Sequence, residues 1–255
     1  MAITEKEAIK ELQTRKEFFV AFSQATKLPY VTCDSETFND QAWVFATEEE
    51  IKEYGKKLLN DKILLMGMKY ENKDFPKFYG TLYGIGVNSV VWNDGEEQIE
   101  VELSHIAKQA DYSQLEPAKR PLINPTLQLS GIYFMQALRR PVKPEERGDM
   151  RELEEEFLAN LRKSEFLIAM AVDENDPKKV NVPYLKGKDD KILHPVFSDV
   201  MEFQKFARDK KLRLAKVAFG KLLTVMIPQA EAFVLNAMGF NLILNKAQMQ
   251  RILGN

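Results

Sequence analysis

The chain has 255 residues, of which 45% are hydrophobic and 29% are charged, proportions that are ordinary for a globular protein. With 36 lysines and arginines against 38 aspartates and glutamates, the formal net charge of −2 gives no general attraction to nucleic acid or anionic lipid. The longest apolar run, Phe166–Val172, has the length of a buried strand and is too short to span a membrane. We therefore expect a cytoplasmic protein without a membrane partner, which the charged N-terminal sequence also favours.

The residue types that carry much of enzyme and metal chemistry are scarce. Cys33 is the single cysteine, so an internal disulfide and a cysteine-based zinc site are excluded. Its acidic neighbours Asp34 and Glu36 disfavour the thiolate, and we interpret Cys33 as a small buried side chain. The two histidines, His105 and His194, are far apart in the sequence, and we interpret His194 as a partly buried imidazole with a hydrogen-bond partner. This pattern predicts no catalytic residue, no metal and no other cofactor.

The first half of the chain predicts alternating helices and strands. Its apolar spacing, capping residues and turn signals indicate, in chain order, a helix over 5–24, strands over 28–32 and 41–46, a helix begun by the capping box of Thr47 and Glu50, a strand over 63–68, a helix opened by Asp74 and Pro76 and closed by Gly84 or Gly86, and strands over 87–92 and 99–103.

The second half predicts a similar order of elements. The pattern indicates, in chain order, a helix capped by Asp149, a strand over 165–173, a strand over 192–197, a helix begun by a capping box of Asp199 and Glu202, one or two strands within 214–225, a helix over 228–238, a strand over 240–245 and a helix over 246–253.

An internal duplication is indicated when the halves are aligned. At an offset of 152, Val44-Phe45 aligns with Val196-Phe197, and the strand, cap and helix that follow agree in order. The same alignment pairs Ile51 with Phe203, Tyr54 with Phe206, Asn93 with Asn245 and, after a slip of one residue, Gly86–Asn88 with Gly239–Asn241. The alternative is a chance agreement between two amphipathic segments. We predict an α+β fold of two tandem copies of a small sheet-and-helix unit, with a divergent first repeat at 1–118, a second at 121–255, and a polar, proline-bearing linker within 110–124.

The densest basic stretch lies between 205 and 221. Such a stretch is either a binding surface for an acidic partner or nucleic acid, or the solvated face of a helix and the loop that follows it. Because Asp209 interrupts the run and the net charge is near zero, we favour the solvated face. The candidate partner surface consists of Lys205, Arg208, Lys210, Lys211 and Arg213.

Four segments of the second half resemble the SseB N-terminal domain family, bacterial proteins named for enhanced serine sensitivity. Asn124–Leu127 is similar to the Asn-Pro-x-Leu that opens such domains, and Glu155–Ala169 to the step from helix to first strand. Leu193–Asp199 resembles the family's Leu-Pro-Val-Phe-Thr-Asp element, with His194 inserted, and Asn241–Asn245 resembles its closing strand. The resemblance covers most of 121–255.

The first half is a fainter copy of the same pattern, with Ala42–Thr47 and Ser89–Asn93 at the equivalent places. The resemblance implies a cytoplasmic α+β protein with no established biochemical activity, and it supplies no catalytic residue. We therefore expect a non-enzymatic interaction or adaptor module with a protein partner. The alternatives are an enzyme or regulator linked to serine or sulfur metabolism, and a binder of nucleic acid or an acidic partner through 205–221.

Overall fold

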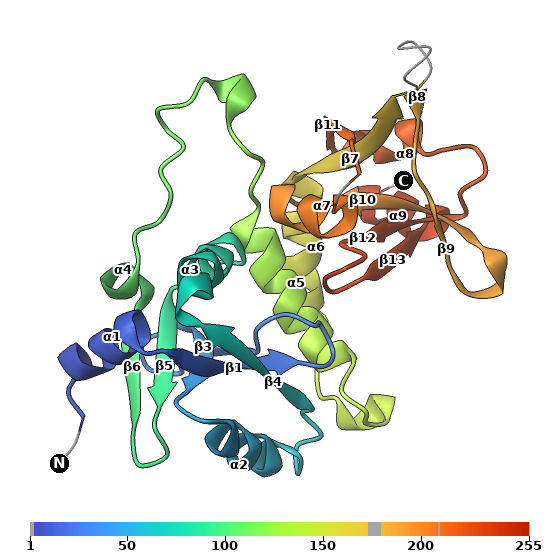
Figure 1. Ribbon diagram of the computed structural model, residues 1–255. Helices are drawn as coiled ribbons and strands as arrows, with labels where there is room; N and C mark the ends of the chain where they lie inside the picture. The colour runs from blue at the N-terminus through green and yellow to red at the C-terminus, as the bar shows by residue number, and fades with distance from the viewer. Residues whose placement is uncertain (1–2, 173–179, 209, 255) are drawn as a thin grey trace. The chain divides into compact units, whose positions relative to one another are not determined.

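The computed structural model describes residues 3–172, 180–208 and 210–254, which form two compact units (Figure 1). Unit 1 consists of Met1–Gln114 with Gly131–Met150, and unit 2 consists of Leu115–Ser130 with Arg151–Asn255. The chain therefore passes between the units three times, and the helix α5 (Pro125–Leu138) contains the second passage. The first passage lies within the predicted linker.

Unit 1 combines one mixed sheet with short helices. Its elements are, in chain order, α1 (Glu5–Thr14), β1 (Glu17–Ser23), β2 (Val31–Cys33), β3 (Asp40–Phe45), α2 (Glu48–Leu58), β4 (Leu65–Glu71), α3 (Phe75–Gly84), β5 (Ser89–Asn93), β6 (Gln98–Glu102) and α4 (Leu103–Ile106). The six-stranded sheet has the order β4-β1-β3-β5-β6, and β2 pairs with β3. The pair of β3 and β5 is parallel and the other pairs are antiparallel. Figure 1 shows α2 on one face of this sheet and α3 on the other.

Unit 2 repeats this topology around a seven-stranded sheet. Its elements after α5 are α6 (Arg151–Lys163), β7 (Glu165–Val172), β8 (Val180–Asn181), β9 (Leu185–Lys186), β10 (Ile192–Phe197), α7 (Val200–Ala207), β11 (Arg213–Ala218), α8 (Leu222–Val225), β12 (Ala232–Leu235), β13 (Leu242–Asn245) and α9 (Lys246–Leu253). The order β11-β7-β10-β12-β13, with β9 beside β10, matches β4-β1-β3-β5-β6 with β2 beside β3. The strand β8 pairs with β7 and is an addition. The predicted α+β fold of two similar units is confirmed.

The central strands of both sheets end in a buried phenylalanine followed by a helix cap. Phe45 and Phe197 are both 0% exposed, so the prediction that they are core residues is confirmed. Thr47 and Glu50 form the predicted capping box at the start of α2. Asp199 caps α7 by accepting from the N–H groups of Met201 and Glu202. The other half of the predicted box, a bond from the Asp199 N–H to the Glu202 side chain, is wrong, because the Glu202 carboxylate accepts from Lys205 instead.

Two predicted helices are wrong. The helix predicted over 5–24 ends at Thr14, and Glu17–Ser23 is the strand β1. The segment predicted as a helix over 228–238 contains the short strand β12 (Ala232–Leu235), with turns on either side. Both misassigned segments are continuous apolar runs, in which periodicity alone does not distinguish a buried strand from a buried helix. In addition, Leu222–Val225 is the helix α8, in a region where only strands were predicted.

The strand register corrects the later part of the sequence alignment. In unit 1, Phe45 of β3 pairs with Asn93 of β5. In unit 2, Val196 of β10 pairs with Leu235 of β12, so the next residue, Phe197, stands opposite Asn236. Asn93 is therefore equivalent to Asn236 rather than to Asn245. The predicted match of Gly86–Asn88 to Gly239–Asn241 is also wrong, because the first precedes β5 and the second follows β12. Segments of different length between the strands change the offset along the chain.

Candidate functional site

A groove in unit 1 runs between the helix α2 and the edge strand β4. Its volume is about 580 Å³. The exposed fractions of Leu59 and Leu64, two of its lining residues, are 47% and 38%. The apolar residues that line it come from β1, from α2 and its C-cap, and from β4 and the residue before it: Phe19, Ile51, Leu59, Leu64, Leu65 and Met66. We call this feature the α2–β4 groove.

Two glycines line the α2–β4 groove and contribute no side chain to it. A Cβ atom at Gly55, on α2, would meet no atom within 4 Å. A Cβ atom at Gly67, on β4, would lie 3.2 Å from Cγ2 of Ile51. The equivalent positions of unit 2, found from the helix caps and the strand register, hold Ala207 and Leu214. The groove thus contains two positions at which the two copies have diverged.

The outer edge of β4 faces no other strand of the described residues. Among the described residues, β1 is the strand that pairs with β4. The N–H of Gln24 donates to Leu64 O at 3.0 Å, and the N–H of Asn72 donates to Lys16 O at 2.9 Å. Because hydrogen-bonded pairs alternate along an antiparallel ladder, the even-numbered residues of β4 bond to β1. The odd-numbered residues direct their N–H and C=O groups outward: Leu65, Gly67, Lys69 and Glu71.

Lysines dominate the rim of the α2–β4 groove. Lys52 and Lys56 lie on α2 and Lys69 lies on β4, whereas Glu48 is the single acidic residue among those lining the groove. Each lysine has an acidic neighbour, with N–O distances of 2.7 Å for Lys52 to Glu48, 2.5 Å for Lys56 to Glu53 and 2.7 Å for Lys69 to Glu17. These exposed pairs contribute about 0–1 kcal/mol each, so the lysines can exchange them for another anion.

The predicted partner surface at 205–213 divides into two parts. Lys205 lies on α7, where its ammonium group pairs with the buried carboxylate of Glu202. Arg208, Lys210 and Lys211 lie in the loop after α7, and all three are exposed, as is Arg213 at the start of β11. Nζ of Lys210 lies 5.5 Å from the centre of the Phe206 ring. The exposed part fits the predicted solvated face, and its role in binding stays a prediction.

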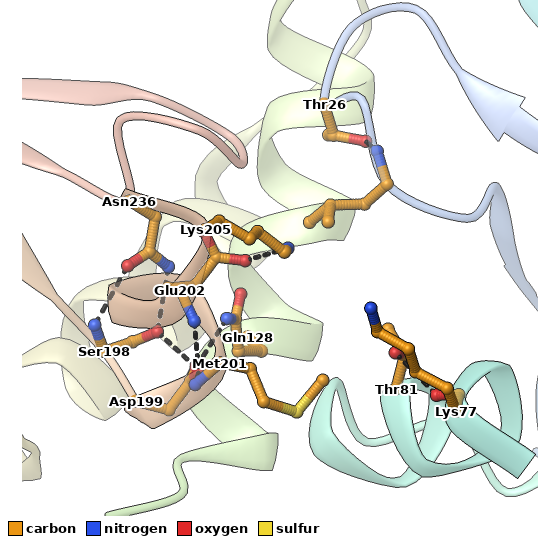
Figure 2. Close-up of polar contacts among 11 residues, drawn as sticks. Thr26, Lys77, Thr81, Gln128, Ser198, Asp199, Met201, Glu202, Lys205 and Asn236 are labelled. Atoms are coloured by element: carbon orange, nitrogen blue, oxygen red, sulfur yellow. Dashed lines mark hydrogen bonds and ion pairs between the residues drawn. The ribbon is translucent and has the colours of Figure 1, made fainter. Parts of the chain in front are cut away.

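A buried polar network fixes the start of α7 (Figure 2). Asp199 Oδ2 accepts from Ser198 Oγ and from Gln128 Nε2, both at 2.7 Å. Asn236 Oδ1 accepts from the N–H of Ser198 at 2.9 Å. Burial raises the pKa of Glu202, an effect that its ion pair with Lys205 opposes. Because these bonds hold the N-terminal end of α7, we interpret the network as a structural element.

The two reactive residue types lie apart from the groove. Cys33 is exposed, so its predicted burial is wrong; it lies at the end of a short strand beside a loop. Partial desolvation and the charges of Asp40 and Asp34 raise the pKa of the Cys33 thiol. His194 is 0% exposed, its Nδ1 accepts from the N–H of Ile227, and burial lowers its pKa to about 4. Neither residue has the environment of a nucleophile or a general base at neutral pH.

The α2–β4 groove was not predicted from the sequence. Two of its lysines, Lys52 and Lys56, lie on a helix whose charged residues indicate exposure to solvent, and the third, Lys69, lies on a strand. The groove also contains two glycines, which offer no side chain from which a site could be predicted. The pairing of the two copies is the signal that could have found it, since Gly55 and Gly67 stand where the other copy has side chains. No helix within the described ranges combines the length and the apolar character that crossing a bilayer requires.

Comparison with known proteins gives one match to a family. Residues 145–250 match the family model of the SseB protein N-terminal domain. A comparison with curated proteins finds no match. Among solved structures, Tic22 from Plasmodium falciparum is 10% identical, with 96% of this chain and 95% of that chain covered and a TM-score of 0.23. Anabaena Tic22, described as a protein of protein transport, is 10% identical, with 92% of both chains covered and a TM-score of 0.22. At such TM-scores these structures support no inference.

The fold and the family match define a class, namely proteins made of two copies of one α+β domain. The second copy contains the matched segment, so residues 145–250 of this chain are similar to the SseB protein N-terminal domain. The resemblance found in the sequence is thus confirmed over 145–250. Asn124–Leu127 and the whole first half lie outside the matched segment.

Proposed function

We propose that this chain is a non-enzymatic module that binds a polypeptide partner in the α2–β4 groove. The observation that carries the proposal is the coincidence of an open apolar groove with the unpaired outer edge of β4. A sheet edge offers main-chain donors and acceptors, and an adjacent groove offers room for side chains. The divergence of unit 1 at Gly55 and Gly67 supports a role that unit 2 does not share.

The chemistry of the remaining residues favours binding over catalysis. The raised pKa of Cys33 disfavours its thiolate, and the lowered pKa of His194 keeps a buried imidazole neutral, remote from solvent. A location in the cytoplasm is part of the proposal, which the single cysteine supports because it suits a reducing compartment.

A blocked groove tests the proposal. Gly55→Phe places an aromatic side chain in the groove, and because its Cβ meets no atom within 4 Å and lies on a helix, the variant should fold at least as well as the parent. Gly80→Phe is the matched control, since Gly80 is an exposed glycine of α3 whose Cβ also meets no atom within 4 Å.

The assay is selection from a display library of random peptides, followed by titration of the enriched peptides. Peptides enriched on the parent should bind the Gly80→Phe variant equally and bind the Gly55→Phe variant at least about tenfold more weakly, a difference of about 1.4 kcal/mol. A library that yields no enriched peptide, or enriched peptides that bind both variants alike, would refute binding at this groove.

A further inference from the structure

We infer that the α2–β4 groove binds its partner as an added antiparallel β-strand, with a bulky apolar side chain opposite Gly67 and an acidic side chain opposite Lys69. This inference rests on the proposed function and specifies its occupant. It follows from the direction of the backbone groups of β4, the face on which Gly67 lies, and the charges at the groove rim.

The register of β4 against β1 determines which residues can receive a strand. Gly67 and Lys69 direct their N–H and C=O groups away from β1, as shown by the alternation of bonds from Gln24 and Asn72. Leu65 O also points outward and accepts from Gln24 Nε2 at 3.2 Å. A strand laid alongside β4 can thus form its first paired hydrogen bonds with Gly67, and the next pair with Lys69.

The same register places the side chain of the added residue in the groove. Gly67 pairs with Ala21 on β1, and Ala21 packs with Ile51 of α2. Directly paired residues of neighbouring strands project to the same face of a sheet. The residue that an added strand pairs with Gly67 therefore projects to the α2 face, where Gly67 and Gly55 contribute no side chain. A bulky apolar side chain at that position fills the space beside Phe19 and Ile51.

Charge defines a second position of the partner. In an antiparallel strand, the residue opposite Lys69 precedes the residue opposite Gly67 by two positions and projects to the same face. Lys52 and Lys56 lie along that face of the groove as well. An acidic residue there meets Lys69 directly, and opposite charges across a strand pair stabilise it. The residue two positions beyond the bulky one lies opposite Leu65, where an apolar side chain fits. The occupant is thus an extended segment with the order acidic, any, bulky apolar, any, apolar.

The test uses a blocked, fluorescein-labelled peptide of about nine residues with glutamate, threonine, phenylalanine, threonine and valine at its centre. Its binding to the full chain is followed by fluorescence anisotropy. Two companion peptides replace the glutamate by lysine or the phenylalanine by glycine. Each companion should bind the parent protein at least about fivefold more weakly. The Lys69→Glu variant should reverse the preference between the glutamate and lysine peptides.

Strand addition is separated from simple groove filling by a pair of variants at one position. Lys69→Pro and Lys69→Thr both remove the lysine, but the proline also removes the outward N–H. Proline is tolerated on an edge strand where its N–H would face solvent, so the ladder to β1 is kept, and circular dichroism checks the fold of both variants. The two peptides that keep the phenylalanine should bind the proline variant at least about tenfold more weakly than they bind the threonine variant.

The outcomes distinguish this inference from the proposed function. Equal binding by the proline and threonine variants, with binding lost in Gly55→Phe, would overturn strand addition and leave the groove as the binding site. No binding of the glutamate peptide to the parent, or no preference over its lysine companion, would overturn the stated chemistry of the occupant. Equal binding to parent and Gly55→Phe would overturn both the inference and the proposed function.

Discussion

Truncation of Phe197 measures how strongly the central strand of unit 2 is held by its core. The side chain is 0% exposed and lies on β10, in the middle of the sheet order. Its ring centre is 5.6 Å from that of Phe203 and 5.1 Å from that of Phe206, both on α7. Phe197→Ala therefore removes the ring that joins the strand to the helix, and leaves a cavity between two elements that cannot both collapse onto it.

The expected loss follows from these contacts. Burial of the ring and the residual cavity together predict a cost of about 3–5 kcal/mol in the free energy of unfolding. Two aromatic neighbours, each contributing roughly 0.5–1.5 kcal/mol beyond area burial, favour the upper half of that range. Urea denaturation followed by far-ultraviolet circular dichroism measures the change from the midpoint and the slope.

A second phenylalanine provides the control for this measurement. Phe38 is 75% exposed, so Phe38→Ala makes the same chemical change at the surface and should alter the free energy of unfolding by less than about 0.5 kcal/mol. If Phe197→Ala costs no more than Phe38→Ala, the packing of β10 against α7 described above is incorrect.

Further predictions concern single polar residues. Because partial desolvation and neighbouring aspartates raise the pKa of the Cys33 thiol, iodoacetamide should alkylate it at pH 7 more slowly than it alkylates a cysteine in an unstructured peptide; equal rates would contradict the raised pKa. Burial lowers the pKa of His194 from 6.5 to about 4, so its neutral form stabilises the fold above pH 6.5, and a contribution of up to roughly 3 kcal/mol should be lost as the pH falls towards 4. Denaturation curves of His194→Gln should lack that part of the pH dependence. Asp199→Ala should cost more in urea denaturation than Thr47→Ala, about 2–4 against about 1 kcal/mol, because Asp199 also serves buried donors and Thr47 is only a half-buried cap; equal costs would refute a stabilising role of the network.

The fold was predictable where short signals in the sequence act locally. The capping box of Thr47 and Glu50 is satisfied within four residues, so its helix begins where the sequence indicates. The strands ending at Phe45 and Phe197 were found for the same reason, since each is followed at once by a cap. By contrast, Glu17–Ser23 and Ala232–Leu235 are apolar on both faces, and only the pairing with distant strands determines that they are extended.

The candidate site was much less predictable. The basic residues at 208–213 could be placed on the surface from their charge, whereas the pairing of Lys205 with a buried Glu202 depends on how α7 packs. The groove depends on β4 being an edge strand and on which of its residues bond to β1. Both properties are set by contacts between residues far apart in the chain, which no local pattern encodes.

The three passages of the chain between the units limit how this protein can be dissected. No single cut releases either unit whole, because Gly131–Met150 belongs with the first unit and Leu115–Ser130 with the second. A fragment limited to the family segment 145–250 would lack Asn124 and Gln128, which bond to Ser198 O and to the carboxylate of Asp199. The duplicated halves are therefore no longer exchangeable modules, and mutational or evolutionary loss of one copy would leave the other incomplete.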